Sequence, residues 1–287
     1  MKKYVLWILT VFFLGGCHRS ENAGSLVVVS IMPQKYFVEK IAGNDVHVTV
    51  LVPPGASPET YSLMPSQMKD LSKARGWLKI GKIGFEQSWS EKIKQNNPQL
   101  KIIDTSVETH WITGSSDREG GQGAGVNPHN WMSPKEACGI IRETCKALES
   151  LFPEYRDKFD KNSQVLLDAV QQLDTMMTSR LGKLSQKKFL IFHPALTYLA
   201  RDYGLEQIAL ENEGKEPSPS YMKNVVREAR EAHIHTIFVQ KEFDQDHAYQ
   251  IAKEIQGNVV RIDPLSENWE QEMKLITDKL TANIAHE

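Results

Sequence analysis

The sequence predicts an α/β protein of two lobes, each with a mostly parallel four-stranded sheet flanked by helices, the two lobes being joined by one long helix. Short apolar, β-branched runs alternate with longer helical patterns, this alternation falls into two sets, and one long helical pattern separates the sets. Continuously apolar strands between helices are typical of parallel sheets that are covered on both faces. A chain of 287 residues with 40% hydrophobic content is long enough to form two such cores.

Eight short runs are predicted to form the strands. In the first half these runs are Leu26–Ile31, Val46–Val52, Trp77–Ile80 and Lys101–Ile103. In the second half they are Phe189–Phe192, Gln207–Leu210, Thr236–Val239 and Val259–Ile262. Helical patterns between them include Pro33–Ala42, Ser66–Ala74, Ser220–Ala232 and Gln245–Ile255.

The long helical pattern runs from Pro153 to Leu184, with apolar side chains mostly three or four residues apart. At 1.5 Å per residue it makes a rod of about 45–48 Å, long enough to lie beside both lobes. The predicted boundaries are 26–152 for the N-terminal lobe, 153–185 for the linking helix and 186–287 for the C-terminal lobe. Cys138 and Cys145 lie seven residues apart in another helical segment, roughly 10 Å and beyond disulfide reach, so we interpret them as small buried side chains.

The N-terminus is predicted to direct export and to carry a lipid. Residues 1–16 have the basic start and short apolar run of a signal peptide, and that run is too short to span a bilayer as a helix. They end in Leu14-Gly15-Gly16-Cys17, which resembles the bacterial lipoprotein cleavage box, in which the cysteine is lipidated. Residues 17–25 would then be a lipidated tether, and the protein would face the periplasm or the extracellular side. The alternative is an ordinary signal peptide with an incidental cysteine.

Charge and loop composition argue against two classes of ligand. Lys and Arg total 34 and Asp and Glu total 36, so no broad basic face for nucleic acid is expected. The glycine-rich loop 113–125 lacks the Gly-Lys-Ser/Thr ending of a phosphate-binding loop, and we interpret it as a solvated surface loop.

Four ligand-type side chains, Glu59, His129, His193 and Asp263, occupy similar places in the predicted topology. Each follows a strand or precedes a helix, and each has a proline as a direct neighbour. Ligands of parallel sheets bind beyond the carboxyl ends of the strands, so two facing lobes would bring the four groups to one cleft. Taken singly, such residues are usually hydrogen-bonded, turn-forming or solvated. Their joint placement predicts a site for one divalent cation.

The motifs around these residues resemble a known family, the bacterial metal-binding lipoproteins that serve zinc and manganese ABC importers. The resemblance spans about residues 26 to 285 and is carried by Pro-Pro-Gly-Ala-Ser-Pro-Glu-Thr-Tyr (53–61), Asn-Pro-His-Asn-Trp-Met-Ser-Pro (127–134), the stretch from His193 to Leu205, Glu-Gly-Lys-Glu-Pro-Ser-Pro (213–219) and Ile-Asp-Pro-Leu (262–265). It implies two lobes joined by one long helix, with the metal between them. It also implies an ABC importer permease as partner; we further expect a monomer.

The sequence departs from this family at Glu59, where the family usually has histidine, and at Asn127, where it usually has aspartate. Glutamate also binds zinc, but a set of two imidazoles and two carboxylates is harder than a three-histidine site and favours manganese or ferrous iron more. The histidine-rich loop common in zinc-specific members is missing as well. Zinc is our first choice of metal and manganese the second.

Three other functions compete with metal uptake. A metal-dependent hydrolase would need an open coordination position and a general base, and neither a His-Glu-x-x-His motif nor a spare carboxylate beside the ligand motifs is seen. We therefore expect no enzymatic activity. A second alternative is a surface protein that acts in cell adhesion or metal storage, and no motif in the sequence argues against it. A binding protein for an organic solute would need a wider, aromatic cleft.

Overall fold

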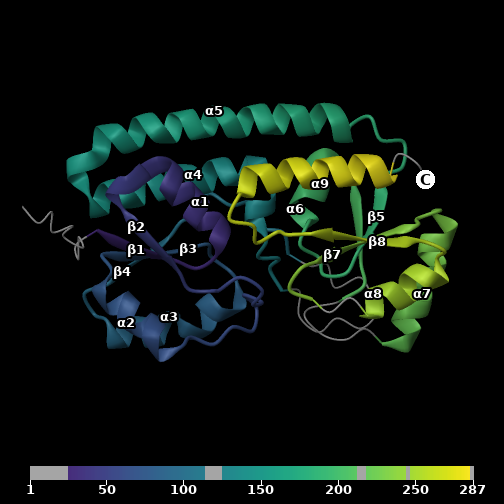
Figure 1. The fold of residues 1–287 in the computed structure, drawn as a ribbon, viewed down its shortest axis with the longest axis horizontal. Helices are drawn as coiled ribbons and strands as arrows, with labels where there is room; N and C mark the ends of the chain where they lie inside the picture. The colour runs from purple at the N-terminus through teal and green to yellow at the C-terminus, as the bar shows by residue number, and fades with distance from the viewer. Residues whose placement is uncertain (1–24, 114–124, 212–217, 244–245, 285–287) are drawn as a thin grey trace, which may run out of the picture.

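The computed structural model describes residues 25–113, 125–211, 218–243 and 246–284. Two four-stranded sheets, parallel throughout, form the centres of two lobes that lie side by side (Figure 1). The first sheet has the order β2-β1-β3-β4 and the second the order β6-β5-β7-β8. Because both sheets share this order, the strand ends of the two lobes are arranged in corresponding ways.

All eight predicted strands are present, with ends shifted by a few residues at most. They are β1 (Leu26–Val29), β2 (His47–Val50), β3 (Gly76–Lys79), β4 (Lys101–Asp104), β5 (Lys188–Ile191), β6 (Glu206–Ala209), β7 (Thr236–Gln240) and β8 (Asn258–Ile262). The inner strands β1 and β7 are almost wholly buried, which explains their unbroken runs of valine, isoleucine and phenylalanine.

Helices cover both faces of each sheet. In the first lobe they are α1 (Met32–Ala42), α2 (Pro65–Lys73), α3 (Gly84–Asn96) and α4 (Pro134–Leu151), with short 3-10 turns at Gly43–Asp45 and Asn130–Met132. In the second lobe they are α6 (Thr197–Tyr203), α7 (Pro219–Glu231), α8 (Asp246–Glu254) and α9 (Trp269–Ile284). Figure 1 shows α2 and α3 below the first sheet and α7 and α8 below the second, with α1, α4 and α9 above.

The predicted linking helix is α5, Arg156–Leu181, which runs above both lobes (Figure 1). It is shorter than the predicted pattern because Pro153–Tyr155 form a separate 3-10 turn and the helix stops before Gly182. Its buried side chains are Phe159, Ser163, Leu166, Val170, Leu173, Met177 and Leu181. They recur every three or four residues, as expected of a helix with one face on a core. The predicted two-lobed α/β architecture is thus confirmed.

The lobes share one continuous hydrophobic core rather than having two separate ones. One cluster of buried side chains includes Val28 of β1, Trp77 of β3, Leu173 of α5, Phe189 of β5 and Trp269 of α9. A second, smaller cluster lies in the C-terminal lobe alone, between its sheet and α7 and α8. Burial of apolar surface across the lobe boundary therefore fixes the lobes to each other.

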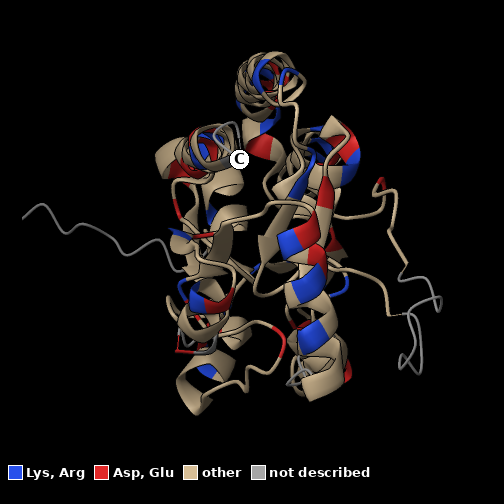
Figure 2. Cartoon of the chain, turned by 90° about the vertical axis from the view of Figure 1, so that its right-hand side faces the viewer, with Lys and Arg blue, Asp and Glu red and all other residues tan. Residues whose placement is uncertain are grey.

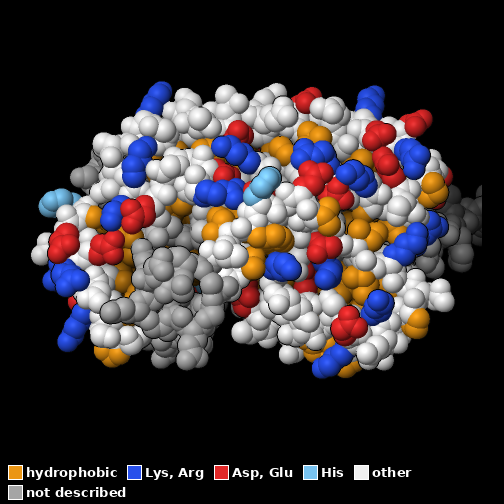
Figure 3. Space-filling view, turned by 180° about the vertical axis from the view of Figure 1, so that it is seen from behind, with side chains coloured by type: hydrophobic (Ala, Val, Ile, Leu, Met, Phe, Trp, Pro, Cys, Tyr) orange, Lys and Arg blue, Asp and Glu red, His pale blue; other side chains and the backbone are white. Residues whose placement is uncertain are grey.

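The surface carries mixed charge. Lys and Arg are mixed with Asp and Glu along the helices seen in Figure 2. On the face in Figure 3 both signs lie between small groups of hydrophobic side chains. No helix in the part of the chain that the structure describes combines the length and the apolar character needed to cross a bilayer.

Several predictions can be compared only in part with the structure. Cys138 and Cys145 are both free, as expected from their spacing; Cys145 is buried, but Cys138 is only partly so. The signal peptide, Cys17 and most of the tether lie outside the described residues, as does the loop between Thr113 and Gly125.

Candidate metal-binding site

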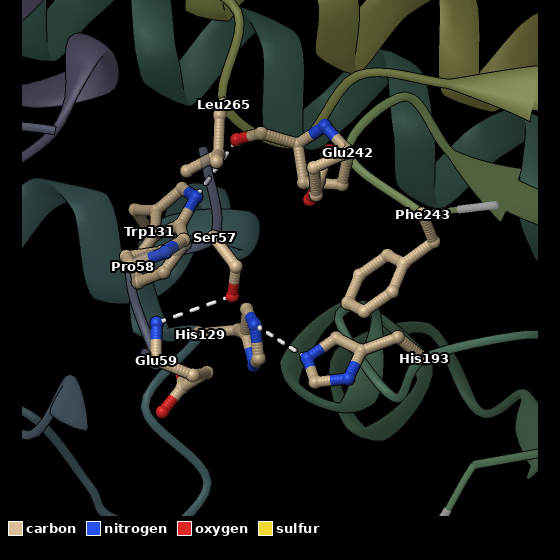
Figure 4. Close-up of a pocket in the computed structure, with 10 residues that line it drawn as sticks. Ser57, Pro58, Glu59, His129, Trp131, His193, Glu242, Phe243 and Leu265 are labelled. Atoms are coloured by element: carbon tan, nitrogen blue, oxygen red, sulfur yellow. Dashed lines mark hydrogen bonds between the residues drawn. The ribbon is translucent and has the colours of Figure 1, made fainter. Parts of the chain in front are cut away.

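A pocket lies between the two lobes, beyond the carboxyl ends of the strands. Its lining consists of Ser57, Pro58, Glu59, His129, Trp131, His193, Glu242, Phe243, Pro264 and Leu265 (Figure 4). The first five of these residues come from the N-terminal lobe and the others from the C-terminal lobe. Three of the four predicted ligands, Glu59, His129 and His193, therefore line the same pocket.

His129 is oriented by the residue two positions before it. The Nδ1 atom of His129 lies 3.0 Å from Oδ1 of Asn127, which also accepts the backbone N–H of His129 at 3.0 Å. The Nδ2 group of Asn127 donates to the carbonyl of Pro194 and to Oγ1 of Thr197, both at 3.0 Å. Since the amide oxygen of Asn127 can only accept, Nδ1 of His129 carries the proton. Its Nε2 therefore faces the pocket with a free lone pair.

His193 follows β5 directly and is held by a carboxylate. Its Nδ1 lies 2.8 Å from Oε2 of Glu211, a residue that follows β6. The ring of Phe243 stacks on the imidazole with centroids 4.9 Å apart and planes at 24°. The Nδ1–H group of His193 donates a hydrogen bond to Glu211, so Nε2 of His193 is the nitrogen with a free lone pair. Such carboxylate–imidazole pairs are the usual outer support of a metal-binding histidine.

The two free nitrogens point at each other. Nε2 of His129 and Nε2 of His193 are 3.2 Å apart, and both rings are buried. Two lone pairs at this distance repel unless a proton or a cation lies between them. Burial holds the pKa of His129 well below its usual range, and protonation of His193 would lower it further, so this imidazole resists a proton. Two nitrogens each about 2.05 Å from a tetrahedral zinc ion would be about 3.3 Å apart, so the spacing fits a shared cation.

Glu59 brings a carboxylate to the same pocket from the loop after β2. Its Oε2 accepts the backbone N–H of Gly84 at 3.3 Å, whereas its Oε1 is buried without a hydrogen-bond partner among the described residues. Burial raises the pKa of Glu59 and outweighs the opposite effect of His193. A buried carboxylate oxygen without a partner is costly, and a bound cation would satisfy it.

Asp263, the fourth predicted ligand, is not part of the pocket lining. Its Oδ2 is paired with Nζ of Lys241 at 2.6 Å, and its backbone N–H donates to Oε1 of Glu272 at 2.8 Å. The next two residues, Pro264 and Leu265, do line the pocket. The structure therefore places the backbone of this motif at the site and the carboxylate beside it.

Two acidic residues near the histidines were missed from the sequence. Glu211 follows β6 and Glu242 follows β7, the same topological position that marked the predicted ligands. Their position directly after a strand could therefore have identified Glu211 and Glu242 as candidates. Both residues, however, lie in polar segments, Glu-Asn-Glu-Gly-Lys-Glu and Gln-Lys-Glu-Phe-Asp, which resemble solvated turns.

The pocket donors do not form a closed coordination shell as they stand. Among the described residues, three ligand-type side chains whose donor atoms all lie within 4.8 Å of one another occur at Cys145, Glu149 and Asp160, and not in the pocket. That other group lies on α4 and α5, outside the pocket lining, and burial raises the pKa of its Cys145 thiol to about 11, which disfavours the thiolate form. In the pocket, the carboxylates must move closer to complete a shell around an ion held by the histidines.

Taken together, the pocket offers two preoriented imidazole nitrogens and buried carboxylate oxygens, and these suit a divalent transition metal. The chain matches the family model described as "Zinc-uptake complex component A periplasmic" over residues 27–285. The chain belongs to this family. Members of this periplasmic zinc-uptake family are metal-binding solute-binding components, not enzymes, and this confirms the prediction of an extracytoplasmic binding protein.

Individual relatives agree with this assignment. The chain is 28% identical to a putative metal-binding protein of Chlamydia muridarum, covering 84% of this chain and 85% of that protein. It is 29% identical to the iron-binding protein YfeA of Yersinia pestis, covering 79% of this chain and 74% of YfeA. The zinc-binding lipoprotein AdcA of Streptococcus pneumoniae is 25% identical over 96% of this chain, which spans only 57% of AdcA.

A solved structure gives the same result. A zinc-bound deletion mutant of ZnuA has a TM-score of 0.85 and 35% sequence identity to this zinc-uptake family member, covering 91% of this chain and 98% of that one. The resemblance on which the sequence analysis relied is therefore confirmed.

Proposed function

We propose that this protein captures a divalent transition metal outside the cytoplasm and delivers it to an ABC importer. The observation that carries the proposal is the 3.2 Å separation of the Nε2 atoms of His129 and His193, each with its other nitrogen engaged by an acceptor. Glu59 would supply a carboxylate, and Asp263 could join only after leaving Lys241. A monomer and an importer permease as partner complete the proposal.

Zinc is the first candidate for the cargo. The imidazole spacing fits it, and relatives named for zinc support it. Manganese or ferrous iron is the second candidate, because Glu59 is a harder donor than an imidazole and YfeA is named for iron.

The test is metal analysis of the purified protein followed by competitive titration with zinc and manganese. H129A and H193A should each lower affinity by about 100-fold or more, since each removes a ligand. His47 is exposed on β2, so H47A is the matched control and should bind as the wild type does. If both variants keep full affinity, or if the wild-type protein binds neither metal, the proposal is wrong.

We also propose that Cys17 carries a lipid anchor that holds the protein at the membrane. The support is the sequence of the cleavage box and the lipoprotein among its relatives. Labelling of expressing cells with a palmitate analogue should mark the wild type and a C138S control, and should fail to mark C17S. Labelling of C17S would contradict the anchor.

A further inference from the structure

Glu242 is an acidic residue of the pocket that the predicted ligand set does not contain. It follows β7, lies in the pocket lining and is followed by Phe243, whose ring stacks on His193 (Figure 4). In this view Glu242 lies above the two imidazoles, and Glu59 lies beside His129 on the other side of the pocket. A carboxylate on this side would approach an ion held by His129 and His193 from the C-terminal lobe.

The surroundings of Glu242 and Asp263 differ in charge. Asp263 is paired with the exposed ammonium group of Lys241, and a metal ion would have to displace that cation to recruit it. Glu242 forms no ion pair within 4.0 Å among the described residues, and it is mostly shielded from solvent.

We propose that Glu242, and not Asp263, is the fourth donor to the metal. This inference rests on the proposed function of the pocket. With Glu59 it gives a set of two neutral imidazoles and two carboxylates, whose two negative charges offset one divalent cation. In this assignment the ion pair with Lys241 holds the Asp263 carboxylate away from the ion, and the carboxylate of Glu242, the residue after Lys241, binds it.

The experiment compares E242Q with D263N, two changes that remove one charge each and conserve side-chain size. Affinities for zinc and for manganese are measured by competitive titration. E242Q should weaken binding by at least about 10-fold, and D263N should stay within about 3-fold of the wild type. If E242Q binds as the wild type does, or if D263N loses as much as E242Q, the proposal is overturned.

A second readout reports coordination directly. Cobalt(II) bound in the pocket has an absorption spectrum that depends on its ligands, and this spectrum should change in E242Q and not in D263N. Thermal melting of the metal-free variants checks that they fold. Should E242Q fail to fold, E242H retains a donor: it should bind zinc with an altered cobalt spectrum, and an unaltered spectrum would overturn the proposal.

The outcomes separate this inference from the proposed function. A wild-type protein that binds no metal would end both. A wild-type protein whose binding is lost in H129A but unchanged in E242Q would leave metal capture standing and end the assignment of Glu242 alone.

Discussion

Glu86 is a fully buried carboxyl group near the start of α3, two residues after Gly84, which contacts Glu59. It accepts hydrogen bonds from the Ser30 hydroxyl and from the backbone N–H groups of Ile80 and Gly81, the latter two at 2.8 Å each. These bonds fix the turn after β3. Burial nevertheless raises the pKa of Glu86 from 4.5 to about 7, because the hydrogen bonds only partly offset the lost solvation.

Glu86 makes its own contribution to the pH dependence of stability. The folded protein holds the Glu86 proton more tightly than the unfolded chain, so the group stabilises the fold most below pH 4.5 and loses that contribution as pH rises to about 7. In E86Q this loss is absent. Between about pH 4.5 and 7, denaturant unfolding of the metal-free protein should therefore show the free energy of unfolding falling more steeply in the wild type than in E86Q, by up to ~1.4 kcal/mol per pH unit.

Glu91, exposed on the same helix, supplies the control for that measurement. E91Q should reproduce the wild-type slope. Equal slopes in E86Q and the wild type would show that Glu86 does not retain its proton in the folded state.

Residue identity predicted much of the pocket, but side-chain direction could not be predicted. Glu59, His129 and His193 were identified because each follows a strand or precedes a helix. Asp263 meets the same criterion, yet its carboxylate lies outside the pocket lining because Lys241, distant in sequence, pairs with it. The ion pair with Lys241 sets the direction of the Asp263 side chain, and the local sequence motif around Asp263 does not contain that information.

At the scale of elements, the start of α3 and the Glu59 loop are in close backbone contact. A Cβ atom on Gly84 would lie 2.3 Å from the carbonyl oxygen of Glu59, a distance at which one of the two backbones must move. The N–H of Gly84 also donates to Glu59 Oε2. Glycine at this position is therefore a requirement for the placement of the Glu59 carboxylate.

G84A should displace the Glu59 loop and weaken metal binding by about 10-fold or more, as the loss of a support to a ligand commonly does. Competitive titration measures the effect. G125A is the matched control, because no described residue lies within 4 Å of a Cβ atom at Gly125. Wild-type affinity in G84A would show that the loop adapts without moving the carboxylate.

The elements were predicted from the sequence more completely than the site. Strands β1, β3, β5 and β7 are largely buried, and their mostly apolar sequences differ clearly from the flanking polar turns. Helices α3, α6 and α9 are not among the predicted helical ranges. The first residue of α9, Trp269, packs on Phe37 of α1 at 5.1 Å between ring centroids, a contact made only in the folded chain.

At the scale of the whole molecule, hydrogen bonds cross the boundary between the lobes behind the pocket. The indole N–H of Trp131 donates to the carbonyl of Pro264 at 2.9 Å, and the indole N–H of Trp269 donates to the carbonyl of Trp131 at 2.7 Å. The hydroxyl of Tyr198 donates to the carbonyl of Asn127 at 2.8 Å. These hydrogen bonds fix the relative orientation of the two lobes, which the shared hydrophobic core holds together.

W269F removes one of these donors and leaves the buried carbonyl of Trp131 without it. We expect the free energy of unfolding to fall by about 1–3 kcal/mol, from the lost hydrogen bond and the space left by the smaller ring. Urea unfolding measures the change. L275A, at a partly exposed position on the same helix, should stay within about 0.5 kcal/mol of the wild type, and an equal loss in both variants would contradict a special role for the crossing bond.

The core shared across the boundary constrains how cargo enters and leaves. Since α5 and α9 pack into the same apolar interior as both sheets, swinging the two halves apart like a clamshell would expose that interior to water. A movement of the short segments around Ser57 and Glu242 costs less free energy as a route for the ion, because these segments line the pocket and not the shared core. In the proposed delivery to an importer permease, displacement of these two segments would release the ion without exposing the shared core.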